Sequence, residues 1–264
     1  MKIKQVLSAL EQFAPLPLQE SWDNAGLQLG LTEAEVSGAL LCLDVNEAIV
    51  DEAIRKGCNL IVSHHPLLFR GLKQISGADY VQRTVIKALK IDIVIVSMHT
   101  NMDNARGGVN WKIAEKLGLE GLTFLVPSPS EKAGEEASGS GVIGNLPSEM
   151  SATDFVQLVK RQFLVACAQC NELLRRPIRR VAICGGAGDF LLDDAVRLGA
   201  DAFITGEMHY HQYFGYEQQL QICVIGHYQS EQYTAEIFRD IIQAHCPGVR
   251  TEMAQTITNP IGYY

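Results

Sequence analysis

Short runs of aliphatic and β-branched residues alternate along the chain with amphipathic segments whose apolar positions recur at helical spacing. The short runs predict strands, and the amphipathic segments predict helices between them. The predicted strands are residues 36–45, 59–63, 92–99, 180–184, 202–205 and 221–226. The predicted helices are residues 47–56, 79–90, 107–117, a segment that begins near Ser151, 189–198 and 230–244. Because strands separated by helices form βαβ units, we expect an α/β fold with largely parallel mixed sheets.

Two of these predicted units resemble each other at a constant separation of 142 residues. Residues 41–65 align without a gap with residues 183–207, and both segments contain the run Asp-x-Ala-x-Arg-x-Gly. Shared periodicity alone would match apolar positions between any two βαβ units, but this run exceeds what periodicity requires. We therefore predict an internal duplication, with a first α/β half at 1–126 and a second at 148–264. Residues 127–147 contain a Ser/Gly/Glu-rich stretch and are predicted as a linker or exposed loop.

Composition narrows the class of protein. Of the 264 residues 47% are hydrophobic, which excludes intrinsic disorder, and a net charge of −8 without a basic cluster disfavours nucleic-acid binding. No apolar run approaches the ~20 residues that span a bilayer, and the N-terminus does not resemble a secretory signal.

Seven scattered cysteines are typical of reduced thiols. The spacing Cys167-Ala-Gln-Cys170 predicts two thiols on one helix rather than a zinc or redox site. We expect a cytoplasmic protein without membrane contact.

Three polar clusters follow predicted strands. They are the pair His64-His65 before Pro66, His99 with Asp103, and His227 with Glu231. Ligands in open α/β sheets bind beyond the carboxyl ends of the strands, so these side chains are candidates for one site. Each cluster could also be explained by local structure, as hydrogen-bonded turn residues or as side chains at the end of a helix. From the adjacent histidines alone, metal binding and a turn are about equally supported.

Imidazole and carboxylate ligands without thiolates suit Zn, Fe, Mn, Co or Ni better than Ca or Mg. Four or more such side chains exceed the three protein ligands that one catalytic metal usually takes. Two divalent ions bridged by a carboxylate would use them all, and such a pair generates hydroxide near neutral pH. Because the candidate ligands come from both halves, we expect the metal site in the cleft between the halves.

Five motifs in this order identify the chain as resembling the family of NGG-interacting factor 3, whose members are also called GTP cyclohydrolase 1 type 2 homologues. The motifs are SWDNAGLQLG, LIVSHHPLLFRGLK, SMHTNMDNARGGVN, GADAFITGEMHYH and GHYQSEQYT. The resemblance implies two metals held by His64, His65, Asp103, His227 and Glu231, with Glu231 as the bridge. It also implies a homohexamer, and the chain is similar to the short members that lack an inserted domain. The last motif departs from the family's usual Gly-His-Tyr-Ala-Thr-Glu at Gln229 and Ser230.

Several further residues near these motifs have less defined roles. His99 aligns in the repeat with His227, which makes it a candidate for contacting the substrate or for supporting Asp103. Glu207, His209 and His211 could line the same cavity, and their roles stay open. Trp22-Asp23-Asn24 is interpreted as a loop lock, that is, as residues that hold the N-terminal loop in place close to the site. The glycines at 185, 186 and 188 predict a closely packed strand-to-helix turn rather than a dinucleotide site.

Two functions are compatible with these residues. The first is a metal-dependent hydrolase of the GTP cyclohydrolase-like group that acts on a nucleotide or a related phosphorylated small molecule, with Glu231 and His99 as catalytic residues. A phosphoesterase of the Asp-His-His type is less compatible, because Ser63 stands where that motif has its aspartate. The alternative is a non-catalytic metal-binding protein, either a regulatory adaptor with a protein partner or a metal carrier. Residues alone do not identify the metal, the substrate or the partner.

Overall fold

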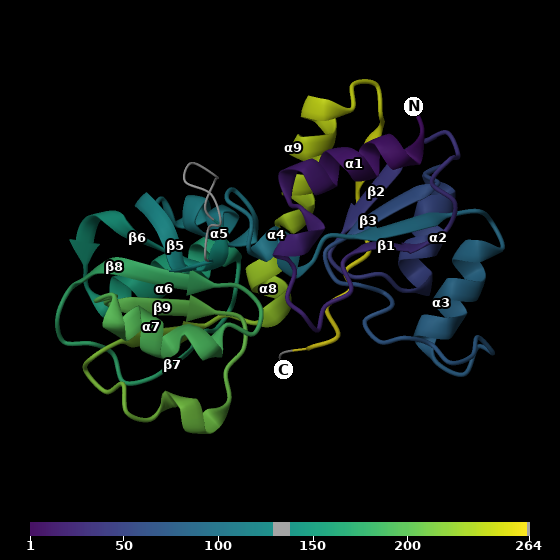
Figure 1. Cartoon of the computed structure of the whole chain (residues 1–264). Coiled ribbons are helices and arrows are strands. Elements are labelled where there is room, and N and C mark those ends of the chain that lie inside the picture. Colours follow the sequence, from purple (N-terminus) through teal and green to yellow (C-terminus); the bar gives the residue numbers. More distant parts are fainter. Residues whose placement is uncertain (129–137, 263–264) are drawn as a thin grey trace. The chain divides into compact units, whose positions relative to one another are not determined.

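A computed structural model describes residues 1–128 and 138–262 and shows an α/β fold with two mixed sheets (Figure 1). The chain divides into two units, each built around its own sheet. The first unit contains residues 1–105 and 234–264, and the second contains residues 106–233. In the part of the chain that the structure describes, no helix is both long and apolar enough to cross a membrane.

The first unit is built on a five-stranded sheet in the order β1-β4-β3-β2-β11. Its strands are β1 (Gly26–Leu29), β2 (Ala39–Cys42), β3 (Leu60–Ser63), β4 (Val94–Ser97) and β11 (Thr251–Met253). All neighbours pair in parallel except β1, which runs antiparallel to β4 at one edge. Every residue of β2, β3 and β4 is buried, which is typical of parallel strands covered on both faces.

Helices cover both faces of this sheet (Figure 1). Helices α2 (Glu47–Arg55) and α3 (Tyr80–Leu89) pack on one face, and α1 (Ile3–Phe13) and α9 (Thr234–His245) lie on the other. Asn46 and Asp79 form the N-caps of α2 and α3, because their side chains accept hydrogen bonds from backbone N–H groups of the first turn. The apolar stripes of α2 and α3 then meet Leu40, Ile61 and Ile95 in a continuous core.

The second unit contains a six-stranded sheet in the order β5-β6-β8-β9-β10-β7. Its strands are β5 (Glu120–Pro127), β6 (Gly139–Met150), β7 (Gln169–Cys170), β8 (Ile178–Cys184), β9 (Ala202–Thr205) and β10 (Gln221–Val224). Strands β8, β9 and β10 are parallel, and the other pairs are antiparallel. Its helices are α5 (Val109–Leu117), α6 (Ala152–Phe163), α7 (Leu192–Arg197), preceded by a 3-10 turn at Asp189–Leu191, and α8 (His227–Glu231).

The predicted repeat has a structural counterpart in the register of the parallel strands. In the first unit Ala39 pairs with Leu60 and Cys42 with Ser63. In the second unit the residues 142 positions later pair in the same way, Val181 with Ala202 and Cys184 with Thr205. A third parallel strand follows on the same side in each unit, β4 beside β3 and β10 beside β9. The predicted βαβ units are therefore confirmed, and they share one register.

The compact units do not have the boundaries expected from the sequence. Residues 234–264 belong with the first unit, because β11 pairs with β2, whereas the expected first half ends at residue 126. Of the expected linker, residues 129–137 lie outside the described residues, and Gly139 onwards forms β6, paired with both β5 and β8. The predicted helix at 230–244 is two helices, α8 and α9. Cys170 lies in β7 rather than on a helix with Cys167.

Candidate metal centre

The histidine pair lies at the carboxyl end of β3, beside the carboxyl end of the neighbouring parallel strand β2. The backbone N–H groups of His64 and His65 both donate to the carbonyl oxygen of Leu43, at 3.1 and 2.9 Å. The Ser63 hydroxyl donates to the carbonyl oxygen of His65 at 3.0 Å. These bonds place the two imidazole rings beside each other, with centroids 4.9 Å apart. His64 is fully buried and His65 is partly buried.

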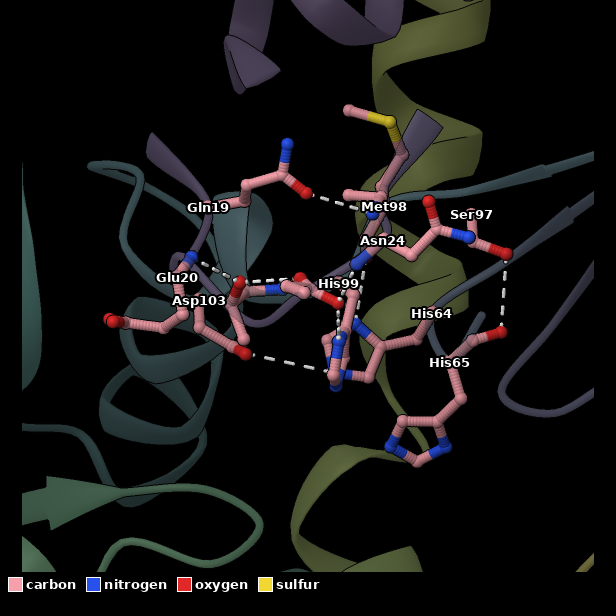
Figure 2. A network of polar contacts seen from close by, with 12 residues as sticks. Gln19, Glu20, Asn24, His64, His65, Ser97, Met98, His99 and Asp103 are labelled. Carbon is pink, nitrogen blue, oxygen red and sulfur yellow. Dashed lines mark hydrogen bonds and ion pairs between the residues drawn. The ribbon is translucent and has the colours of Figure 1, made fainter. Parts of the chain in front are cut away.

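A third imidazole joins this pair from the neighbouring strand. His99 follows β4 and precedes the short helix α4 (Thr100–Asp103). Its ring centroid lies 5.2 Å from that of His64 and 5.4 Å from that of His65 (Figure 2). One nitrogen from each of the three rings lies within 4.8 Å of the other two, so this cluster could hold a metal ion. The parallel strands β3 and β4 produce this arrangement, because their carboxyl ends meet at one edge of the sheet.

The three rings are oriented by acceptors at their Nδ1 atoms. His64 Nδ1 lies 2.9 Å from the carbonyl oxygen of Met98, His65 Nδ1 lies 2.7 Å from Asp44 Oδ1, and His99 Nδ1 lies 2.7 Å from Asp23 Oδ1. Carbonyl and carboxylate oxygens only accept hydrogen bonds, so in the neutral ring each Nδ1 carries the proton and each Nε2 carries the lone pair. This is the tautomer that a metal-binding histidine adopts when an outer acceptor orients it.

Asp103 brings a carboxylate to the same cluster. It is the last residue of α4, and its backbone N–H donates to the carbonyl oxygen of His99 at 3.1 Å. Its Oδ1 lies 3.7 Å from His64 Nε2 (Figure 2). The first unit therefore brings together four residues singled out from the sequence, His64, His65, His99 and Asp103.

Two carboxylates behind the histidines complete this cluster. Asp23 accepts hydrogen bonds from His99, from the Thr100 backbone N–H at 3.0 Å and from the Thr100 hydroxyl at 2.5 Å. Burial alone would raise the pKa of Asp23, but the hydrogen bonds from His99 and Thr100 outweigh burial and lower this pKa to about 2. Burial likewise opposes ionisation of Asp44, whose pKa is lowered by the hydrogen bonds from His65 and Thr258. Both groups are therefore carboxylates at neutral pH.

Asp44 is the functional candidate that the sequence analysis missed. It follows β2 by two residues, and the signal that could have found it is that β2 is the neighbour of β3 in the predicted parallel sheet. Asp23 was interpreted only as part of a loop lock, and the structure shows why that interpretation is incomplete. The same carboxylate that fixes the N-terminal loop to Thr100 also orients His99.

The second unit holds the other two predicted ligands on one short helix. His227 and Glu231 are the first and last residues of α8, and His227 Nε2 lies 3.0 Å from Glu231 Oε2. His227 Nδ1 lies 3.1 Å from Glu207 Oε1, so this imidazole also has a carboxylate at Nδ1. Glu207 thus contacts His227, a role that the sequence left open. Glu231 is buried, whereas Glu207 is about half exposed.

The glycine turn after β8 packs against Glu231. A methyl group on Gly186 would lie 2.4 Å from Glu231 Oε1, and the Gly186 backbone N–H donates to the Ser230 hydroxyl at 3.0 Å. Gly186 also has a positive φ of 60°. The prediction of a closely packed turn is confirmed, and the packing partner is the predicted bridging carboxylate.

Two other candidates in the second unit have different surroundings. His209 is exposed, with Nδ1 3.3 Å from Asp189 Oδ2. The ring of His211 contacts Tyr210 and Phe214, with centroids 5.2 and 6.3 Å away.

Comparison with known proteins gives consistent matches over nearly the whole chain. The family model described as Duf34/NIF3 (NGG1p interacting factor 3) matches residues 1–260. A Clostridium perfringens protein named GTP cyclohydrolase 1 type 2 homolog is 35% identical over 232 residues, covering 88% of this chain and 87% of its own length. A Streptomyces coelicolor protein of the same name is 30% identical, covering 98% of this chain and 93% of its own.

Solved structures resemble the whole chain. The crystal structure of a Bacillus cereus protein described as related to NIF3 matches with a TM-score of 0.91 and 26% identity, covering 100% of this chain and 99% of that one. A Staphylococcus aureus protein, SA1388, matches with a TM-score of 0.90 and 26% identity over the same shares. The fold of this chain is thus found in solved proteins.

Proposed function

The chain belongs to the Duf34/NIF3 family, and from this we propose that it is a dinuclear metal-binding protein that acts as a metal-dependent hydrolase of the GTP cyclohydrolase 1 type 2-like group. The observation that carries the proposal is the adjacent imidazole pair His64 and His65, each with an acceptor at Nδ1, beside the Asp103 carboxylate. Histidines oriented in this way present Nε2 to a metal.

The proposed ligands of the two ions are His64, His65, Asp103, His227 and Glu231, with Glu231 as the bridge. The donor set fits this assignment, because imidazole and carboxylate groups suit Zn, Fe, Mn, Co or Ni. In the first unit His64, His65 and Asp103 supply two nitrogens and a carboxylate. An ion held by these three ligands needs solvent or a further ligand to complete its coordination. In the second unit His227 and Glu231 are too few for an ion of their own. We propose that both sets bind the same pair of ions.

When bound, two such ions supply Lewis acidity and a nucleophilic hydroxide at neutral pH. His99 then serves as the group that moves a proton. Asp23 accepts the hydrogen bond from His99 Nδ1, which leaves Nε2 able to accept a proton. The ionised state of Asp23 supports this role, since its pKa is lowered to about 2. Glu207 orients His227 in the same manner.

Exposed aromatic rings beside His99 support a substrate with a planar ring. Trp22 and Phe69 are 58% and 47% exposed, and their ring centroids are 5.8 Å apart. Each ring lies edge-on to His99, at 6.0 and 6.2 Å between centroids. Exposed aromatic faces stack on heterocycles, and Arg70, which follows Phe69 at the surface, offers a cation to a phosphate. A nucleotide or a related phosphorylated small molecule fits both features.

The test combines metal analysis with activity. The purified protein should contain two transition-metal ions per chain and should hydrolyse GTP or a member of a phosphoester panel. Glu231→Ala should lower both the metal content and the turnover by at least about tenfold. Glu149→Ala is the matched control, because Glu149 is an exposed carboxylate on β6 and should leave both unchanged. Turnover that survives in Glu231→Ala would refute the catalytic assignment.

A second candidate function is a metal-dependent adaptor or carrier without turnover. The observation that favours it is an exposed aromatic cluster in the second unit, where Tyr210 is 73% and Phe214 58% exposed and their ring centroids are 5.5 Å apart. Exposed aromatic residues are enriched where proteins bind one another. Stoichiometric metal with no turnover, and capture of a protein partner that is lost after chelation, would establish this function instead.

We also propose that the chain assembles as a homohexamer. Light scattering at micromolar concentration should give a mass near six times 29.0 kDa. A mass near 29.0 kDa would refute this assembly.

A further inference from the structure

Two cysteines face each other across the edge of the sheet in the second unit. Cys170 on β7 and Cys223 on β10 are Cα partners in an antiparallel pair. Partners in such a pair have Cα atoms about 4.5–5.5 Å apart, and a disulfide needs about 4.4–6.8 Å. The backbone therefore already has the spacing that a disulfide requires. Neither residue belongs to the proposed metal centre.

The two thiols also contact each other and have different surroundings. Hydrogen bonding between the two side chains, together with the charge of Lys160, lowers the pKa of Cys170 although burial opposes the shift. The same bond, burial and the charge on Cys170 raise the pKa of Cys223 well above its usual value. Cys170 is partly exposed, whereas Cys223 is fully buried.

We propose that Cys170 and Cys223 form a thiol–disulfide exchange site that reacts with low-molecular-weight disulfides and closes an intramolecular disulfide between β7 and β10. The Cys170 thiolate attacks one sulfur of the small disulfide, forms a mixed disulfide and releases one small thiolate. The Cys223 sulfur then attacks the Cys170 sulfur, and the second small thiolate leaves. The protons of both cysteines end on the two small thiols, so the protein dithiol is oxidised while the small disulfide is reduced.

The surroundings of the two sulfurs favour formation of the disulfide over its reduction. The first step is favoured because the partly exposed residue is the one whose thiolate is stabilised. The reverse reaction is slow, because a reductant reaches only the exposed Cys170 sulfur and must expel Cys223, a leaving group of high pKa. Once closed, the disulfide would hold the two-residue strand β7 to β10, whose chain continues through Gly226 into α8.

The experiment uses the full chain with Cys167→Ser, which removes the exposed neighbouring thiol. This protein is incubated with glutathione disulfide, quenched in acid, denatured and titrated for thiols, and it should lose two thiols without retaining glutathione. Trypsin should then release a disulfide-linked pair of peptides, residues 162–175 and 198–239, that separates on reduction. The Cys223→Ser and Cys223→Ala proteins should instead accumulate a stable glutathione adduct on Cys170.

Other results would overturn the proposal. A glutathione adduct on Cys170 that persists while Cys223 stays reduced would show that the two sulfurs cannot join. A Cys167–Cys170 link in the wild-type protein would assign the exchange to the sequence-adjacent pair. Failure of Cys170 to react, under conditions that modify Cys167 in the wild type, would show that no exchange site exists.

Discussion

At the scale of single residues, the candidate centre depends on the acceptors behind its imidazoles as much as on the imidazoles. His65 is oriented by Asp44, and Asp44 is itself held by the Thr258 hydroxyl, 2.6 Å from its Oδ2. Thr258, in the C-terminal segment, is thereby connected through two hydrogen bonds to the proposed ligand His65. A carboxylate in this place fixes both the tautomer and the direction of the ring.

Removing that carboxylate should weaken metal binding. We expect Asp44→Ala to lower the metal affinity by about 10–100-fold, because His65 loses the acceptor that keeps its lone pair on Nε2. Competition with a chelator measures the affinity. Asp51→Ala is the control, since Asp51 forms an ion pair with Lys87 on the surface of the same unit. Equal affinities for the two variants would contradict the role of Asp44.

Glu52 should make stability depend on pH in the acid range. Its buried carboxylate accepts backbone N–H bonds from Gln255 and Thr256, at 2.7 and 2.9 Å. Burial raises the pKa of Glu52, but these bonds, the Thr256 side chain and Lys56 together lower it from 4.5 to about 2. Because the folded state has the lower pKa, the stabilisation is complete above about pH 4.5 and is lost as the pH falls towards about 2.

The measurement is urea unfolding of the wild type and Glu52→Gln at neutral pH and near pH 2. At neutral pH the variant should be less stable by about 1.5–3 kcal/mol, the usual contribution of hydrogen bonds to a charged group. The difference should shrink in acid. Glu47→Gln, on the exposed side of the same helix, should show a smaller difference at both pH values. A difference for Glu52→Gln that does not change with pH would contradict this account.

The sequence could predict His64, His65 and Asp103 as neighbours because each follows a strand within one βαβ pattern. It could not predict that Asp23 orients His99, because these residues are 76 positions apart and their contact depends on how the N-terminal loop packs. Asp44 was not predicted either, since a single aspartate after a strand is indistinguishable from a turn residue until the order of the strands is known.

At the scale of elements, local signals predicted most helices and strands. Asn46, Asp79 and Ser151 begin their helices as N-caps, and Gly118 ends α5 in the left-handed conformation. The break between α8 and α9 was not predicted, because Gln232 and Tyr233 are compatible with a continuous helix. It separates two helices that belong to different units.

The glycine turn at Gly186 offers a test of packing against a proposed ligand. Gly186→Ala should displace Glu231, because the added methyl group would lie 2.4 Å from Glu231 Oε1, and we expect a loss of about 1–3 kcal/mol in stability together with weaker metal binding. Gly199→Ala is a matched control. Gly199 has a similar φ of 70°, but a methyl group there meets nothing within 4 Å. It should show only the cost of backbone strain and should keep the metal affinity, as measured by thermal unfolding and chelator competition.

At the scale of the whole molecule, duplication and domain boundaries are different properties. The repeat covers two βαβ units whose parallel strands share one register, and the sequence showed that relation directly. Residues 234–264 nevertheless return to the first unit, where β11 extends the sheet beside β2. Sequence similarity did not predict this return, because β11 has no counterpart in the repeat and its position depends on pairing with β2.

This division predicts which part of the chain folds alone. A fragment of residues 106–233 contains all six strands of its sheet and should unfold cooperatively in urea. A fragment of residues 148–264 follows the expected second half but lacks β5 and most of β6, the two strands beyond β8, while it carries α9 and β11 without the sheet they pack on. It should therefore have no cooperative transition, because its sheet would expose unpaired backbone groups at one edge and α9 would expose its apolar face. Circular dichroism during urea titration distinguishes the two fragments, and cooperative unfolding of 148–264 but not of 106–233 would contradict the observed division.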